Sequence, residues 1–571
     1  MKNIPLYDVR PISNLKEMLE SSTVLFGDKP AFWVKKGDSS EYSPISYKQF
    51  KSDVDSLGTA LCDLGLQGKR IAIIGENRYE WAVSYLAIVN GTGVVVPLDK
   101  ELPENEIASL LTRAKVSAII YTDKVENQIK NISKYINFVN YYINMDTSKD
   151  NNVLSFSHLI EKGRKLITEG NNNFIKAKIN NDEMSILLFT SATTDISKAV
   201  MLSHTNICSN LMAMSSMVYI DNNDIFLSIL PIHHAYECTC GFLCPIYRGS
   251  SIAYFEGLRH IVKNLKESKA TIVLGVPLIF ESMYKKIIDQ VSKKPNGLLK
   301  LKTAIKINNL LKIFKIDLSK KFFAPVHENL GGNIRLFISG AAAIDPAVSK
   351  GFRDLGINFL QGYGLTECSP IVALNRDVDF KDDAAGIALT NLKVVIENKN
   401  SEDIGEIIVK GPSVMLGYYE NEEANQEAFS NGWFKTGDLG YIDKDHFIHI
   451  TGRKKNVIVT KNGKNIFPEE IETLLNMNNY IKESMVFGKK DKDSDDAIIA
   501  AAIVPDMEKI AEDFNDKEIS KEFIYDLVKS HVKEVNNNLV SYKHIKEIEI
   551  REKEFEKTTT KKIKRYMEIR D

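Results

Sequence analysis

The sequence is poor in cysteine and contains no long apolar run. Its 571 residues include six cysteines, and its start, MKNIPLYDVRPISNLKEML, lacks the apolar core of a secretion signal. These two features predict free thiols in a reducing compartment and argue against a disulfide scaffold. The longest apolar candidate, AIIAAAIVP at 497–505, is shorter than the roughly 18 residues of a membrane span and is typical of a buried strand. We therefore expect a cytoplasmic protein without a transmembrane helix.

An excess of charge of either sign is also missing. Lys and Arg number 74 and Asp and Glu number 75, which leaves a net charge of −1. Such a balance gives no overall field that draws polyanions, so no nucleic-acid partner is expected. An apolar content of 44% with 26% charged residues is typical of a globular protein. The length exceeds what one core usually serves, which predicts at least two domains.

Three of the cysteines stand close together, as Cys238, Cys240 and Cys244 in YECTCGFLCPIY. A metal site would need a fourth ligand at a recognisable spacing, which the sequence lacks, and apolar residues surround the group. We therefore interpret the three as small buried core residues, with a metal site as the alternative.

Helical and strand-like patterns alternate along the chain. ISYKQFKSDVDSLGTALCDLGLQ repeats apolar residues at helical spacing, and KRIAIIGEN is typical of a short buried strand that ends in a glycine turn. Similar pairs occur in EWAVSYLAIVNGTGVVVPLD, ATIVLGVPLIFESMYKKI and NIRLFISGAAAIDPAVSKGFRDL. This alternation favours an α/β architecture with parallel strands, and ligands are expected at the C-terminal ends of those strands.

One segment, residues 293–321, interrupts this alternation. It holds nine lysines among Leu, Ile and Phe, and Asp317 is its only acid. A basic amphipathic helix of this kind could lie on an anionic membrane, which predicts peripheral contact with the inner membrane surface. The alternative is a pair of solvated helices packed on the domain.

A second unusual stretch, LLFTSATTDISKAVMLSH at 187–204, contains no glycine. Its hydroxyl groups and its lysine suit a triphosphate, but phosphate loops normally use glycine so that backbone N–H groups can close on phosphate oxygens. The stretch is therefore a working nucleotide loop, a damaged one or a polar turn. If it binds phosphate, the expected residues are Thr190, which is also a candidate magnesium ligand, Ser191, Thr193, Thr194 and Lys198.

Three later stretches supply other groups that ATP requires. In QGYGLTECSP, the ring of Tyr363 can stack on adenine, the hydroxyl of Thr366 can bind a phosphate and the carboxylate of Glu367 can hold magnesium. In GWFKTGDLGYID, Asp438 can accept both ribose hydroxyls, and EFEKTTTKKIKRY supplies Lys562. The residues of the first stretch expected to bind the cofactor are Gln361, Tyr363, Gly364 and Thr366.

Taken in order and spacing, these stretches together with GRKKN and LPIHHAYE closely resemble the adenylate-forming (AMP-binding) superfamily, specifically its long-chain fatty acyl-CoA synthetase branch. The resemblance extends from about ISYKQF to the last lysines. It implies a large N-terminal domain, residues 1–452, made of α/β layers with mixed sheets and a small β-barrel-like subdomain. It also implies a small, mobile α+β C-terminal lid domain, residues 453–571, that turns about a hinge at Lys455.

The resemblance implies a ligase that uses ATP, Mg²⁺ and coenzyme A. A fatty acid and ATP would give an acyl-adenylate and pyrophosphate, and coenzyme A would then take the acyl group, giving acyl-CoA and AMP. Negative charge grows on the α-phosphate in the first step, so lysine, magnesium and oriented N–H groups are the stabilisers required. No general base is needed, because a carboxylate with an ordinary pKa of about 4 to 5 is already a nucleophile at neutral pH.

The resemblance also implies roles for single residues. Lys562 would bridge the substrate carboxylate and the α-phosphate, His234 would align the acyl carboxylate, and Arg453 would lie near ribose and phosphates. SGAAA at 339–343 looks like the adenine-binding turn, while His233 is expected to be structural. The expected catalytic residues are Lys562, Thr366, His234 and Lys198, Glu367 is the magnesium ligand, and the adenine-binding turn contributes Gly340, Ala341 and Ala342.

The glycine-free loop departs from the family pattern. Ala192, Asp195 and Ala199 stand where the family has glycine, and Ser197 stands where it has proline. Alanine is tolerated wherever φ stays negative. A carboxylate at Asp195 facing the phosphates would repel them by about 1 to 3 kcal/mol. We interpret the loop as working but altered, with weaker affinity for ATP.

Two further departures are Glu556 and Lys561, which stand where the superfamily often has proline and glycine. Two other functions stay open at this stage. The acyl acceptor could be an acyl carrier protein, because an acceptor surface has no short signature. The chain could also be a catalytically weakened fatty-acid or nucleotide binding relative, which Asp195 supports and Lys562 opposes.

Overall fold

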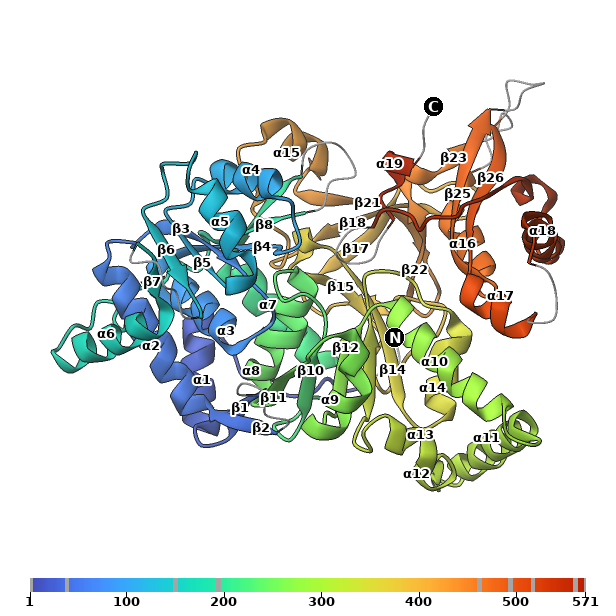
Figure 1. The fold of residues 1–571 in the computed structure, drawn as a ribbon, viewed down its shortest axis with the longest axis horizontal. Coiled ribbons are helices and arrows are strands. Elements are labelled where there is room, and N and C mark those ends of the chain that lie inside the picture. Colours follow the sequence, from blue (N-terminus) through green and yellow to red (C-terminus); the bar gives the residue numbers. More distant parts are fainter. Residues whose placement is uncertain are drawn as a thin grey trace. The chain divides into compact units, whose positions relative to one another are not determined.

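The computed structural model describes residues 4–35, 41–146, 152–190, 197–459, 465–490, 497–514, 519–557 and 563–568 (Figure 1). They form two compact units. The first contains most of residues 1–393 together with 409–432, and the second contains 394–408 and the chain from 433 onward. Both units combine helices with sheets, so the predicted α/β class is confirmed. The predicted boundary between residues 452 and 453 and the hinge at Lys455 stay predictions.

The first unit contains a nine-stranded mixed sheet, in the order β16-β15-β14-β13-β12-β10-β11-β1-β2. Its strands are β1 (Pro30–Lys35), β2 (Tyr42–Ser46), β10 (Ile225–Ser228), β11 (Ser251–Tyr254), β12 (Ile272–Gly275), β13 (Leu336–Ser339), β14 (Asn358–Gly364), β15 (Ile371–Leu374) and β16 (Ile387–Ala388). The run from β14 to β1 is parallel, and the remaining three strands are antiparallel. Every residue of β11 and β12 is buried, as expected for parallel strands that are covered on both faces.

A second sheet has eight strands, in the order β19-β9-β8-β4-β3-β5-β6-β7. Its strands are β3 (Lys69–Ile74), β4 (Gly93–Leu98), β5 (Ala118–Tyr121), β6 (Tyr141–Asn144), β7 (Leu154–Ser155), β8 (Met184–Phe189), β9 (Ala199–Ser203) and β19 (Gly417–Tyr418). β8 and β9 pair as an antiparallel hairpin. The hydroxyl-rich stretch predicted from the sequence therefore joins two strands of one hairpin.

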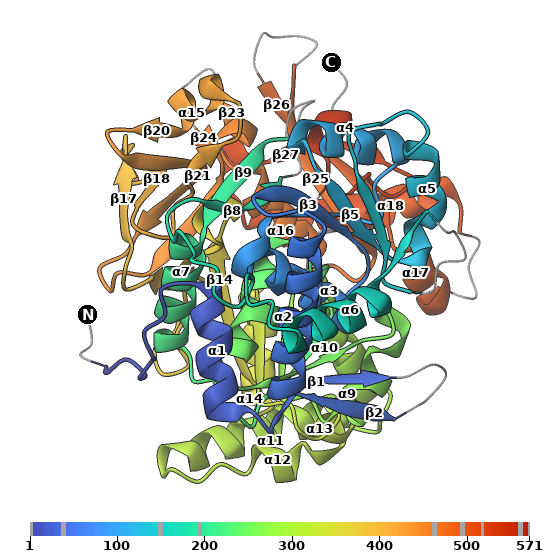
Figure 2. The same cartoon turned by 90° about the vertical axis from the view of Figure 1, so that its left-hand side faces the viewer.

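The helices of the first unit include all those predicted from apolar spacing. They are α1 (Leu15–Phe26), α2 (Tyr47–Asp63), α3 (Tyr79–Ala87), α4 (Glu104–Ala114), α5 (Glu126–Ile132), α6 (Phe156–Thr168), α7 (His204–Met217), α8 (Cys244–Arg248), α9 (Ile261–Ser268), α10 (Pro277–Ser292), α11 (Gly297–Ile313), α12 (Ser319–Phe322), α13 (Ala324–Asn329), α14 (Pro346–Asp354) and α15 (Glu422–Ala428), with the short strand β20 (Phe429–Ser430). Helices α1, α2, α3 and α6 pack side by side (Figure 2). The Ser46 hydroxyl caps α2 by accepting from the N–H of Gln49 at 3.2 Å.

Two of the three clustered cysteines lie in the π-helical turn η3 (Glu237–Leu243), and the third begins α8. All three are buried, which confirms their interpretation as core residues. Burial also raises the pKa of the Cys238 thiol to about 12 and that of Cys244 to about 11. These side chains are therefore thiols at neutral pH.

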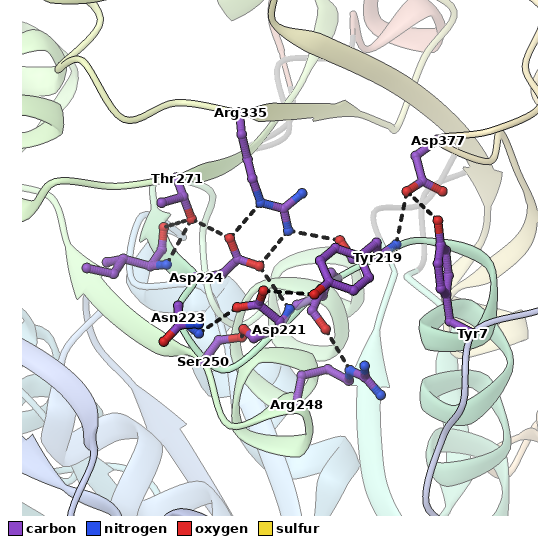
Figure 3. A network of polar contacts seen from close by, with 12 residues as sticks. Tyr7, Tyr219, Asp221, Asn223, Asp224, Arg248, Ser250, Thr271, Arg335 and Asp377 are labelled. Carbon is purple, nitrogen blue, oxygen red and sulfur yellow. Dashed lines mark hydrogen bonds and ion pairs between the residues drawn. The ribbon is translucent and has the colours of Figure 1, made fainter. Parts of the chain in front are cut away.

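A polar network joins the N-terminal ends of the parallel strands (Figure 3). The buried Asp224, directly before β10, accepts from Nε of Arg335 before β13 and from the hydroxyl of Thr271 before β12, each at 2.7 Å. Ser250, before β11, donates to the carbonyl of Asp221 at 2.7 Å. These bonds fix the strands at this edge, and the loops that carry the predicted site leave from the opposite edge.

The second unit contains a sheet in which β17 (Lys393–Glu397), β18 (Gly405–Lys410) and β21 (Trp433–Ile442) follow one another, with β22 (Ile448–Arg453) paired to β21. Another sheet joins β25 (Ile481–Lys490), β26 (Ala497–Pro505) and β27 (Ile545–Ile550), and β23 (Ile458–Val459) pairs with β24 (Asn465–Ile466). The helices are α16 (Pro468–Asn476), α17 (Met507–Asp513), α18 (Lys521–Asn537) and α19 (Arg565–Glu568). The prediction of a buried strand at AIIAAAIVP is confirmed by β26, whose Ala501 and Ile503 are fully buried.

Across the described ranges, no helix is both long enough and apolar enough to span a bilayer.

Candidate active site

Thr190 and Lys198 stand at the two ends of the loop between β8 and β9. The N–H of Thr190 donates to the carbonyl of Lys198 at 2.9 Å, and the Thr190 hydroxyl donates to the same oxygen at 3.3 Å. Arg113 of α4 donates to the hydroxyl of Ser197 at 3.1 Å and to its carbonyl at 2.7 Å. The base of the loop is therefore closed and braced by a helix.

Residues 191–196 of this loop lie outside the described residues. Three of the expected phosphate-binding residues belong to this segment, namely Ser191, Thr193 and Thr194. The departures Ala192 and Asp195 lie there as well. The roles assigned to them from the sequence stay predictions.

Tyr418 brings together two predicted site residues that are far apart in the sequence. It lies on β19, which pairs with β9 opposite Val200, next to the loop between β8 and β9. The ammonium of Lys198 lies 4.6 Å from the centroid of the Tyr418 ring, a cation–π contact. The Tyr418 hydroxyl donates to Oε1 of Glu367 at 2.9 Å. The sequence analysis did not identify Tyr418 as a site residue. It follows Gly417 in MLGYYENEE, a stretch that lies outside the predicted motifs.

The segment with Thr366 and Glu367 is a short 3₁₀ turn, η5 (Thr366–Cys368), which is held from two sides. Asn210 of α7, fully buried, donates from its amide to the carbonyls of Cys368 at 3.1 Å and Ile371 at 2.8 Å. From the other side, the N–H of Met415 donates to the carbonyl of Glu367 at 2.8 Å. Because the turn is fixed, the half-buried side chains of Thr366 and Glu367 are held in place. Asn210 is a second supporting residue that the motifs did not reveal.

The QGYG and SGAAA stretches lie at the C-terminal ends of neighbouring parallel strands, where Ser339 of β13 is in register with Gln361 of β14. This confirms the placement expected of an α/β sheet. Gln361 is buried, and its amide donates to the carbonyl of Asp382 at 2.7 Å. At Gly364, a Cβ atom would lie 2.1 Å from the carbonyl oxygen of Pro370, so only glycine fits. The preceding Tyr363 is half-buried.

Tyr236 joins the LPIHHAYE stretch to the SGAAA turn. Its hydroxyl donates to the carbonyl of Ile338 at 3.1 Å. A Cβ on Gly340 would lie 2.8 Å from a ring carbon of Tyr236, so the ring closes on this glycine. His234 is half-buried, with its ring centroid 4.2 Å from that of His233. Burial lowers the pKa of His233 to about 3, so this ring is neutral at physiological pH.

Glu237, which follows directly, is a buried carboxyl group that sequence reasoning did not single out. Its Oε1 accepts from the hydroxyl of Ser228 at 2.5 Å, and a Cβ on Gly241 would lie 2.6 Å from its carboxyl carbon. Burial raises the pKa of Glu237 to about 8, so the group is mainly protonated at neutral pH.

Ala341 holds an unusual backbone conformation within the SGAAA turn. Its φ is +72°, in the left-handed region that favours glycine. An L-residue in this region costs roughly 1 to 2 kcal/mol. The side chains of Ala341 and Ala342 are exposed.

In the second unit, Asp438 and Arg453 lie directly opposite each other on β21 and β22. The Arg453 Nε donates to Oδ1 of the buried Asp438 at 2.7 Å. The N–H of Asp438 donates to the hydroxyl of Thr436 at 3.0 Å. The two residues that the sequence assigned to ribose and phosphates therefore form one ion pair within this unit.

Lys455 is exposed in the turn η6 (Lys454–Asn456). Lys562 falls within residues 558–562, outside the described part of the chain, and Lys561 belongs to the same segment. The residues that flank the segment, Lys557 and Ile563, form a β-bridge.

Comparison with family models gives a match described as AMP-binding enzyme over residues 19–419. The chain belongs to the AMP-binding enzyme family. A second match, described as AMP-binding enzyme C-terminal domain, covers residues 455–570. The resemblance drawn from the motifs is therefore confirmed.

Individual members of the AMP-binding enzyme family are similar to this chain over most of its length. Fatty acyl-CoA synthetase B of Dictyostelium discoideum is 27% identical over 544 residues, which cover 90% of this chain and 80% of that protein. Long-chain-fatty-acid–CoA ligase 1 of Cavia porcellus is 28% identical over 557 residues, covering 89% of this chain and 76% of the ligase. Among solved structures, the anthranilate CoA ligase AuaEII in complex with anthranoyl-AMP has a TM-score of 0.76 at 19% identity, and covers 99% of this chain and 98% of that one. This last likeness concerns the fold alone.

Proposed function

We propose that the protein is an AMP-forming ligase that activates a fatty acid with ATP and transfers the acyl group to coenzyme A. The observation that carries this proposal is the contact of Tyr418 with both Lys198 and Glu367 beside the phosphate loop. A lysine of the kind that binds phosphate and a carboxylate suited to magnesium thus contact the same side chain in a member of the AMP-binding enzyme family. The names of its fatty acyl-CoA synthetase and ligase relatives support a fatty acid as the substrate.

In the first step, a carboxylate oxygen of the fatty acid attacks the α-phosphorus of ATP. A new oxygen–phosphorus bond forms, the bond from the α-phosphorus to the bridging oxygen breaks, and pyrophosphate leaves. Lys562 would neutralise charge on the carboxylate and the α-phosphate, and Lys198 would do the same for the outgoing phosphates. Thr366 would donate to the α-phosphate, and His234 would align the carboxylate.

Several of the predicted site residues would bind the nucleotide. Tyr363 would stack on adenine beside the turn formed by Gly340, Ala341 and Ala342. The carboxylate of Asp438 would accept the ribose hydroxyls, and Arg453, its ion-pair partner, would lie near the phosphates. Gln361 and Gly364 would shape the adenine pocket, because the amide of Gln361 already bonds to the backbone.

The residues around Glu367 fit a magnesium ion shared with ATP. Mg²⁺ usually takes one or two carboxylates together with substrate phosphates. Glu367 would hold the ion, with Thr190 as a further candidate ligand. Magnesium would supply neutralisation of phosphate charge.

In the second step, the thiol sulfur of coenzyme A attacks the acyl carbon of the mixed anhydride. The sulfur–carbon bond forms, the carbon–oxygen bond to AMP breaks, the thiol proton is released to solvent, and acyl-CoA and AMP result. Rotation of the C-terminal lid about Lys455 would open the path for the thiol. Peripheral membrane contact through residues 293–321 belongs to the same proposal.

Acyl transfer with the acceptor varied tests this proposal. Purified protein with oleate, ATP and Mg²⁺ is given either coenzyme A or a phosphopantetheinylated acyl carrier protein, and product is followed by loss of free thiol and by mass spectrometry. We expect oleoyl-CoA and AMP in equal amounts. Transfer to the carrier protein alone would instead identify the alternative acceptor.

A further inference from the structure

The peptide groups on either side of Lys198 are both held by hydrogen bonds. The carbonyl before it, that of Ser197, accepts from Nη2 of Arg113 at 2.7 Å. The carbonyl of Lys198 itself accepts from the N–H of Thr190 at 2.9 Å. Because a peptide group is planar, these two contacts fix the backbone on both sides of the lysine. Its side chain therefore starts from a fixed backbone, and its ammonium lies 4.6 Å from the centroid of the Tyr418 ring.

Arg113 bonds to two acceptors of one residue. Its Nη1 donates to the hydroxyl of Ser197 at 3.1 Å, while its Nη2 donates to the Ser197 carbonyl. A guanidinium group is planar and presents its donors in a fixed fork, so the two bonds together determine how Ser197 is oriented. An ammonium group, which is a point charge on a flexible stem, would not impose the same geometry.

The helix that carries Arg113 is itself anchored in the core. Arg113 stands in the last turn of α4, and its guanidinium carbon lies 5.3 Å from the centroid of the Phe189 ring on β8, a cation–π contact. Three apolar side chains of α4 are fully buried, namely those of Ile107, Leu111 and Ala114. Because α4 is packed into the core in this way, it provides a fixed point for the residues that precede β9.

Ser197 is also a position at which this chain departs from the family pattern, which has proline there. A proline ring fixes φ at about −65° and so restricts the backbone next to the lysine. Serine has no such restriction, and ordering it costs more conformational entropy. The two bonds from Arg113 supply through a neighbouring helix the restriction that a proline ring supplies within the chain.

We propose that Arg113 is a positioning residue for Lys198, and that its bonds to Ser197 take the place of the proline of the family pattern. The inference rests on the proposed function, in which Lys198 neutralises charge on the outgoing phosphates of ATP. A lysine contributes as a point charge, so its effect depends on where its backbone is held. A misplacement of about 1 Å costs on the order of 100-fold in rate. Arg113 acts through Ser197 rather than on the substrate.

Binding of ATP and of AMP to the full chain, measured by calorimetry with Mg²⁺ and without fatty acid, tests the proposal without turnover. Arg113→Met should lose about 10-fold in affinity for ATP and none for AMP, because AMP lacks the phosphates that Lys198 neutralises. Arg113→Lys keeps the charge but not the fork, so it should behave like Arg113→Met. Equal losses for both nucleotides, or full ATP affinity in Arg113→Lys, would overturn the proposal.

Restoring the proline of the family pattern is a second test. Arg113→Met/Ser197→Pro should recover most of the ATP affinity that Arg113→Met loses, because the ring restricts φ again. Without recovery, the brace and the proline are not equivalent and the proposal fails. The matched control is Arg248→Met, which removes a guanidinium in the last turn of α8 that likewise donates to backbone carbonyls, those of Ile220 at 2.9 Å and Asp8 at 3.0 Å. It should change neither affinity.

Fatty-acid-dependent exchange of pyrophosphate into ATP, measured in parallel, separates this inference from the proposed function. Exchange should fall about 10- to 100-fold in Arg113→Met, while transfer from preformed oleoyl-adenylate to coenzyme A, which involves no outgoing phosphates, should be unchanged. Full exchange in Arg113→Met would overturn the positioning role alone. No exchange in the wild type, with the ATP-specific loss of affinity still present in Arg113→Met, would overturn the proposed function and support the brace.

Discussion

Tyr418 contacts Glu367 and Lys198 at once, its hydroxyl 2.9 Å from the carboxylate oxygen and its ring 4.6 Å from the ammonium. One side chain therefore contacts both a positive and a negative group, next to the loop between β8 and β9. Because Tyr418 is buried, these contacts are shielded from water. We infer that it positions the two groups for ATP and magnesium.

Tyr418→Phe keeps the ring under Lys198 but removes the hydrogen bond to Glu367. A hydrogen bond to a charged group contributes about 1.5 to 3 kcal/mol, so adenylation should fall by roughly 10-fold or more. The specific expectation is a higher Mg²⁺ concentration at half-maximal rate, measured by titrating Mg²⁺ at fixed ATP. Tyr419→Phe, which removes the neighbouring hydroxyl that accepts from Arg70, is the matched control and should change neither value. An unaltered Mg²⁺ titration in Tyr418→Phe would refute the positioning role.

Glu237 should make stability depend on pH. Its pKa is about 8 in the folded protein against 4.5 for the ordinary side chain, so the folded state holds a proton that the unfolded state releases between these values. The contribution of Glu237 to the free energy of unfolding is therefore largest below pH 4.5. It falls as the pH rises to about 8, by on the order of 3 to 5 kcal/mol. Glu237→Gln removes this ionisation.

Thermal unfolding of both proteins from pH 5 to pH 9 tests that expectation. The melting temperature of the wild type should fall more steeply over this range than that of Glu237→Gln. At pH 8.5 the variant should have the higher melting temperature. Parallel profiles would show that the carboxyl group does not stay protonated in the fold.

Ala341→Gly should stabilise the protein, because glycine adopts φ of +72° without the strain that alanine has there. Glycine also gives the unfolded chain more conformational entropy, which offsets part of this effect, so the net gain should be about 0.5 to 1 kcal/mol. Ala342→Gly is the matched control, since Ala342 has negative φ and should be destabilised by a similar amount. Denaturant unfolding measures both, and equal destabilisation of the two variants would contradict the assigned strain.

Particular residues show which parts could be predicted from the sequence. Local apolar spacing was enough to predict α2, β3 and α10 from the sequence, because the apolar residues of each segment must be buried. The QGYGLTECSP and SGAAA stretches were placed correctly at strand ends, because parallel strands bring such loops to one edge. Tyr418 and Asn210 were not found, since their contacts join segments more than 50 and 150 residues apart. The burial of Glu237 likewise depends on packing of η3 against β10 rather than on its neighbours in sequence.

The direction in which α11 faces could not be predicted either. Apolar residues and lysines are spread all around that helix, so periodicity gives no preferred side. The attachments of Asn308 to Ser319 and of Asn309 to Asp354 determine which side is exposed.

Fatty-acid-dependent exchange of pyrophosphate into ATP tests the central claim most directly, because it reports adenylation without any assumption about the acceptor. The assay covers carboxylic acids from acetate to oleate, with Lys562→Ala as the inactive control. Exchange should peak at one range of chain length and be lost in Lys562→Ala. Absence of exchange with every acid, followed by its appearance in Asp195→Gly, would contradict it and show that the glycine-free loop has left a binding protein.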